Sequence, residues 1–148
     1  MNPEFHPDAE WRPVRVPGYF DSQFKELENY DGLFWYRLEF ELPPRFSASE
    51  AELSLGPVDD ESWVWLNGSF LGAVTAQTQA ANCWEVPRNY HLKTGLLKPG
   101  KNVLVVLCND LAGTGGILGT PLLRIPQKYS FHTDSPVASD DPYRYYRW

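Results

Sequence analysis

The dipeptide Asn67-Gly68 is the feature that most constrains how this chain can fold. It separates two apolar stretches, residues 62–66 and 69–74. A two-residue connection of this type is the strongest short-range signal for a β-hairpin, because both central residues of a type I′ turn have positive φ. The sequence therefore predicts a hairpin over residues 62–74 and, with it, a β-protein.

Several other stretches also read as strands. Residues 33–42 alternate with period two, so Phe34, Tyr36, Leu38, Phe40 and Leu42 should share one buried face. Residues 103–108 are apolar on both faces, which is typical of a central strand covered on two sides. Further strands are expected at 11–16, 51–55, near Tyr90 and at 122–125, with a turn at Gly56-Pro57 and a glycine-rich loop at 113–119. No stretch has sustained helical periodicity, so we expect an all-β fold: a two-sheet antiparallel β-sandwich or jelly roll.

Length and charge narrow the function classes. The 148 residues fit one domain, 1–148, and 13 Lys and Arg against 19 Asp and Glu give a net charge of −6. This acidic balance argues against nucleic acid or an anionic membrane as a partner, since both need clustered Lys and Arg. The longest aliphatic run, residues 103–108, is too short to cross a bilayer. Residues 1–6 show no signal-peptide pattern.

Aromatic residues are unusually abundant, at 15% of the chain. Such a surplus of rings suits either stacking on sugar faces or a protein interface. Trp84, Arg88, Tyr90 and Asn82 form the first candidate surface, where a polar loop meets a strand. The second choice is Trp63 and Trp65, which alternate with Val64 and Leu66 and should point away from the core, together with Trp35 and Arg37.

Catalytic and metal-binding patterns are weak. The sequence has no Gly-x-Ser-x-Gly elbow and no His-Glu-x-x-His spacing, so we expect no enzyme activity from the chain itself. The only dense carboxylate cluster, Asp59-Asp60-Glu61, fits a turn whose side chains bond backbone N–H groups; a calcium site or acceptors for sugar hydroxyls are the alternatives. No other cofactor is expected. The sequence does not decide whether Cys83 and Cys108 form a disulfide.

The order of short motifs resembles a known family. It runs from Trp11-x-x-Val14-x-Val16-Pro17-Gly18 through Tyr30-Asp31-Gly32-x-x-Trp35-Tyr36-Arg37 and the hairpin to Arg88-Asn89-Tyr90, Leu97-Lys98-Pro99-Gly100-Lys101-Asn102 and Gly115-Gly116-Ile117. This order resembles the sugar-binding jelly-roll domain of glycoside hydrolase family 2, and most closely the galactose-binding-like module of sialate O-acetylesterase-type proteins. The similarity covers roughly residues 11–125, followed by an aromatic tail at 127–148. An opening strand and the catalytic domain of such enzymes have no counterpart in the motif match.

The resemblance implies a non-catalytic accessory module of a glycoside hydrolase or carbohydrate esterase, secreted or periplasmic. Our leading hypothesis is a carbohydrate-binding module that holds a polysaccharide or oligosaccharide by aromatic stacking and hydrogen bonds. The alternative is an interaction domain that docks a catalytic domain or a second copy without binding sugar. A Trp-lined groove with polar groups between the rings would favour the first hypothesis, and an exposed apolar patch the second.

Overall fold

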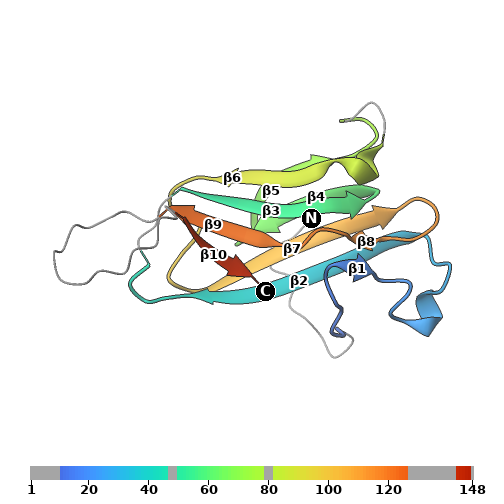
Figure 1. Ribbon diagram of the computed structural model, residues 1–148, viewed down its shortest axis with the longest axis horizontal. Helices are drawn as coiled ribbons and strands as arrows, with labels where there is room; N and C mark the ends of the chain where they lie inside the picture. Colours follow the sequence, from blue (N-terminus) through green and yellow to red (C-terminus); the bar gives the residue numbers. More distant parts are fainter. Residues whose placement is uncertain (1–10, 47–49, 79–81, 127–142, 148) are drawn as a thin grey trace.

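The computed structural model describes residues 11–46, 50–78, 82–126 and, by backbone alone, 143–147. Two antiparallel sheets pack face to face (Figure 1). The first has the order β2-β7-β4-β5, and its strands are β2 (Gly32–Leu42), β7 (Gly100–Asp110), β4 (Glu61–Leu66) and β5 (Ser69–Val74). The second has the order β1-β8-β3-β9-β10, with β6 paired to β3; its strands are β1 (Gly18–Tyr19), β8 (Gly116–Ile117), β3 (Ala51–Asp59), β9 (Leu122–Pro126), β10 (Tyr143–Arg147) and β6 (Pro87–Leu92).

This architecture confirms the predicted all-β, two-sheet antiparallel sandwich. The only helical elements in the described ranges are the single 3₁₀ turns η1 (Lys25–Leu27) and η2 (Cys83–Glu85). None of the described helical elements is long and apolar enough to span a membrane.

The Asn67-Gly68 hairpin is present as predicted. Asn67 has a φ of 50° and Gly68 a φ of 81°, as a type I′ turn requires, and Leu66 lies opposite Ser69. Beyond the turn, Trp65 pairs with Phe70 and Val64 with Gly72, so a β-bulge follows the first pairs. The hairpin therefore fixes which side chains of β4 and β5 share a face.

The main core lies between the two sheets. All five alternate residues of β2 from Phe34 to Leu42 pack into it, which confirms the predicted inward face. From β4 and β7 come Val64, Leu66, Leu104, Val106 and Cys108, and from the opposite sheet Leu53, Leu55 and Leu123. Cys108 and Cys83 are buried free thiols, and they do not form a disulfide.

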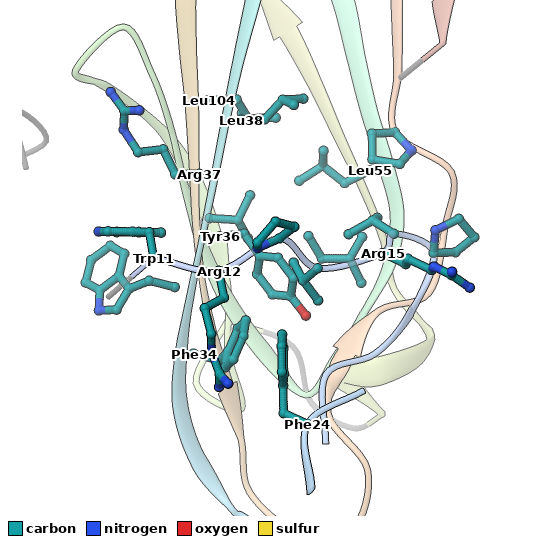
Figure 2. Close-up of a pocket in the computed structure, with 18 of the residues that line it drawn as sticks. Trp11, Arg12, Arg15, Phe24, Phe34, Tyr36, Arg37, Leu38, Leu55 and Leu104 are labelled. Carbon is teal, nitrogen blue, oxygen red and sulfur yellow. The ribbon is translucent and has the colours of Figure 1, made fainter. Parts of the chain in front are cut away.

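The predicted strand at 11–16 is wrong. These residues, which we call the strap with Pro17 included (11–17), form no ladder, because Pro13 and Pro17 each lack the N–H that a ladder needs. The Gln23 side chain holds the strap instead: its Oε1 accepts from the Arg15 N–H at 2.7 Å, and its Nε2 donates to the Arg15 carbonyl at 3.0 Å. Figure 2 shows the strap running across the edge of the sandwich from Trp11 to Arg15.

The predicted turn at Gly56-Pro57 is also wrong. Strand β3 continues to Asp59, with a register shift between Ser54 and Gly56 in its pairing with β6. Gly56 has a φ of 67°, and a Cβ there would lie 2.6 Å from the Gly119 Cα. Glycine thus makes a bulge and a close backbone contact here, where the sequence alone reads as a break.

Candidate functional site: an aromatic face on the four-stranded sheet

The outer side of the four-stranded sheet carries a contiguous set of apolar side chains. Strand pairing puts Trp35, Leu107 and Trp63 in one cross-strand row. The next row is Arg37, Val105, Trp65 and Phe70. We call the apolar members of these rows, together with Val103, the aromatic face: Trp35, Trp63, Trp65, Phe70, Val103, Val105 and Leu107. The sheet alternation that sends Val64 and Leu66 into the core sends these residues to the other side.

The rings of the aromatic face form a continuous file over β2, β4 and β5. The Trp35 and Trp65 centroids lie 5.9 Å apart, and those of Trp65 and Phe70 lie 5.5 Å apart. Trp65 is the buried middle member at 9% exposure, whereas Trp35 is 40% and Phe70 57% exposed. The doubly apolar pattern of β7 is thus explained: Val105 and Leu107 are buried under this file. No other described strand covers the outer ends of the file.

The polar groups beside this face are already paired. The Arg37 guanidinium forms an ion pair with the Glu39 carboxylate, and Lys101 Nζ lies 2.6 Å from Glu39 Oε2. The hydrogen bonds from Lys101 and then from Arg37 hold the pKa of Glu39 below its ordinary value. Arg37, predicted as a sugar donor, therefore already uses part of its donor capacity within the protein.

The residues of the first predicted surface, around Trp84, do not lie together in the structure. Trp84 lies on η2, beside β3 of the other sheet, and is 46% exposed. Asn82 precedes it in the left-handed region, and its Nδ2 donates to Glu85 Oε2 at 3.1 Å. These two residues are at the surface, but they do not join the aromatic face.

The predicted rim position of Arg88 is wrong, because its side chain is only 1% exposed. Its Nε donates to Ser62 Oγ at 2.9 Å and its Nη2 to the Asp60 carbonyl at 2.7 Å. Its Nη1 donates to the carbonyls of Cys83 and Val86. Burial lowers the pKa of the guanidinium. Arg88 fastens η2 and β4 from within, so it has no free face for a ligand.

The predicted surface position of Tyr90 is wrong as well. Its ring packs against the main core and faces Gly72 of the opposite sheet, where an added Cβ would lie 3.1 Å from Tyr90 Cε1. Burial raises the pKa of its hydroxyl to about 12. The period-two pattern of β6 could have shown this, since Tyr90 lies on the same face of the strand as the buried Arg88 and Leu92.

The acidic cluster matches the turn interpretation. Asp60 Oδ2 accepts from the Leu111 N–H at 2.9 Å, and Glu61 accepts from the Ala76 N–H and from Asn109 Nδ2. Burial, with the charges of Asp60 and Asp110 beside it, raises the pKa of Asp59 to about 6. Within the ranges that the structure describes, no group of three His, Cys, Asp or Glu side chains could hold a metal ion. The calcium alternative gains no support from this geometry.

A hollow that sequence reasoning missed lies under the strap at the edge between the sheets (Figure 2). It has a volume of about 1030 Å³ and is lined mainly by apolar side chains. In Figure 2, Trp11 and Arg37 lie on one side of β2, and Tyr36 and Leu55 on the other. Arg12 closes part of the hollow by stacking on the Phe24 ring at 4.3 Å. The alternation of Val14 and Val16 between prolines was its only sequence signal.

The fold is a two-sheet β-sandwich whose four-stranded sheet carries an apolar outer face, the architecture of an all-β accessory domain. The chain belongs to the family described as the β-galactosidase second all-β domain, whose model matches residues 6–114. A search of curated proteins found no match.

Solved structures agree with this assignment. The chain is similar to a GH2 β-galacturonidase from Eisenbergiella tayi, with a TM-score of 0.57 and 21% identity over 74% of this chain and 19% of that one. For a β-glucuronidase from Bifidobacterium dentium the TM-score is 0.57, with 27% identity over 70% of this chain and 16% of that one. For a β-glucuronidase from an uncultured Clostridium the TM-score is 0.63, with 18% identity over 80% and 23%. The chain thus spans less than a quarter of these enzymes.

Proposed function

We propose that this chain serves as a structural accessory domain of a family 2 glycoside hydrolase, and that its aromatic face packs against the catalytic part of the enzyme. The observation that carries the proposal is the file of Trp35, Trp65 and Phe70, which is exposed at both ends and underlain by buried Val105 and Leu107. Residues 1–148 would act as one unit in this role. The likeness to sialate O-acetylesterase-type modules remains a prediction from the motifs.

The chemistry of the face favours docking over sugar binding. A saccharide needs hydrogen-bond partners between the stacking rings, but Val105 and Leu107 stand between Trp35, Trp63 and Trp65. Covering exposed rings of this size stabilises a complex by roughly 1–2 kcal/mol for each ring, without new polar contacts. An interface centred on Trp35 and Phe70 would therefore gain mainly from apolar burial.

The test is a binding titration in trans. The B. dentium β-glucuronidase, made without the segment that matches this chain, is titrated with the isolated chain and followed by calorimetry. Saturable binding is expected, and the double variant Trp35→Glu/Phe70→Glu should weaken it by at least about tenfold, since a charge must then be buried. Trp84→Glu, on the other sheet's side, should bind like the wild type. Absence of binding, or equal loss in both variants, would overturn the proposal.

Sugar binding is the second candidate, and the observation that favours it is the exposed indole of Trp84 next to Asn82. Affinity would be weak, on the order of millimolar, because a single ring and a few donors must offset the ordering of the sugar. Affinity electrophoresis in gels with neutral polysaccharides tests it. Retardation that Trp84→Ala abolishes without a change in melting temperature would support this function; migration unaffected by any polysaccharide would remove it.

A further inference from the structure

The free edge of β5 differs from every other sheet edge in the described chain. Strand β5 pairs only with β4, and its residues Ser69–Val74 include no charge and no proline. The other edges are protected: β1 has two residues, β2 bears Arg37, Glu39 and Glu41 and is crossed by the strap, β6 begins at Pro87 and contains His91, and β10 contains Arg144 and Arg147.

An unprotected edge is a template for another strand. Its outward N–H and C=O groups have no ladder partner, and proteins normally block such edges with charges, proline or very short strands. The bulge in the β4–β5 pairing bends this edge, but neither a charge nor a proline blocks it. Within the described ranges, residues 69–74 form no hydrogen bond outside the sheet ladders.

We propose that β5 pairs antiparallel with β5 of a second copy of this chain, joining two four-stranded sheets into one continuous sheet. A two-fold axis between Leu71 and Gly72 would set Phe70 of one copy opposite Ala73 of the other. Phe70 and Ala73 pair with Trp65 and Trp63, so both lie on the outer side of the sheet. Leu71 packs toward the core, and Gly72 faces Tyr90 there, so the inner residues also pair with each other. In this register, the outward-facing residues of one copy lie opposite outward-facing residues of the other, and inward-facing residues lie opposite inward-facing ones, as a continuous sheet requires.

Charge places no local obstacle to a second copy at this edge. Each chain has a net charge of −6, which opposes association in general. The β5 edge has no charged residue, so this pairing brings no like charges opposite each other. It also places the exposed Phe70 rings of both copies on one shared surface, which removes apolar area from water.

Sedimentation equilibrium of the isolated chain from 5 µM to about 1 mM tests the proposal. We expect a monomer–dimer equilibrium, and Phe70→Lys and Ala73→Lys should each weaken dimerisation by about tenfold or more, because two lysines would face the seam. Leu33→Lys, an exposed apolar position at the start of β2, is the matched control and should dimerise like the wild type. Melting curves confirm that each variant is folded.

Amide hydrogen exchange locates the contact independently. Exchange at residues 69–74 should slow as the protein concentration rises, while exchange at residues 33–37 should not change. A chain that stays monomeric at 1 mM would overturn the proposal. So would a dimer that survives both lysine variants, or one whose concentration-dependent protection falls on β2 or β6. None of these outcomes depends on whether the aromatic face docks a catalytic domain.

Discussion

The side chains of Asn67 and Asn102 are joined by a hydrogen bond of 2.8 Å, from Asn67 Nδ2 to Asn102 Oδ1. Asn102 is fully buried, and its Nδ2 donates to the carbonyls of Lys98 and Gly100. Asn67 Oδ1 in turn accepts from the Val103 N–H at 2.9 Å. The hairpin turn is therefore fastened to the turn that precedes β7, and the two amides satisfy backbone groups that neither turn satisfies alone.

Asn102→Ala should destabilise the protein strongly. The change leaves the carbonyls of Lys98 and Gly100 and the amide of Asn67 without this partner, at a cost of roughly 2–4 kcal/mol. Urea unfolding measures the loss. Asn109→Ala, which removes a single hydrogen bond to Glu61 at the half-buried end of β7, is the control and should cost about 1 kcal/mol or less. Equal losses in the two variants would contradict the structure.

Gly68→Val should destabilise through the backbone alone. Gly68 is exposed with a φ of 81°, and a β-branched residue there is strained by on the order of 1–3 kcal/mol. Ser69→Val, one position later in β5, places the same side chain in a strand and should be nearly neutral. Thermal melting compares the two, and an unchanged melting temperature in Gly68→Val would refute the type I′ geometry.

Arg88→Met should cost on the order of 3 kcal/mol, because the Ser62 hydroxyl and the Asp60 carbonyl lose their buried donor. Sugar affinity, if the chain has any, should not change in the folded fraction. Arg12→Met, which removes an exposed ion pair with Glu26 and the stacking on Phe24, should destabilise the protein much less. If Arg88→Met were as stable as the wild type and changed ligand binding, this result would contradict the buried position of Arg88.

Stability should fall as the pH rises from 5 to 7.5. The pKa of Asp59 is raised from an ordinary value of 3.8 to about 6, so its protonated form favours the folded state. That stability is complete below 3.8 and is lost as the pH rises through about 6. Solvent contact at Asp59 limits the effect to on the order of 1 kcal/mol. Guanidinium unfolding at both pH values should show the decline.

Asp59→Asn should remove most of this decline and stabilise the protein at pH 7.5, because the amide cannot ionise beside Asp60 and Asp110. Glu28→Gln, on the exposed segment after η1, is the matched control and should leave the decline intact. A flat profile in the wild type, or the same decline in Asp59→Asn, would assign the pH dependence to other groups.

Three features were predictable because each depends on local sequence. The hairpin follows from positive φ at Asn-Gly, the inward face of β2 from its alternation of apolar and polar residues, and the position of β7 from its continuous apolar run. Gly56 and the strap were not, because their structures depend on distant partners. The bulge at Gly56 depends on the close approach of Gly119, which is distant in sequence. The conformation of the strap depends on the Gln23 side chain, which binds Arg15 eight residues earlier.

The candidate site was predicted in part. Alternation places Trp63 and Trp65 away from the core, and β-pairing then adds Trp35 beside them. Arg88 misled the prediction, because an arginine near a polar loop usually reaches solvent. Only the carbonyls that η2 and the end of β3 turn inward make its burial favourable, and those appear when the chain is folded.

Strand β7 is apolar on both of its sides, yet the described chain lays a second sheet over only one of them. On the other side, within the described ranges, Val105 and Leu107 are covered only by the aromatic side chains of their own sheet. The strand is composed like the middle layer of three. Under the proposed docking, the catalytic part of the enzyme would supply that third layer, and the aromatic face would become an internal interface.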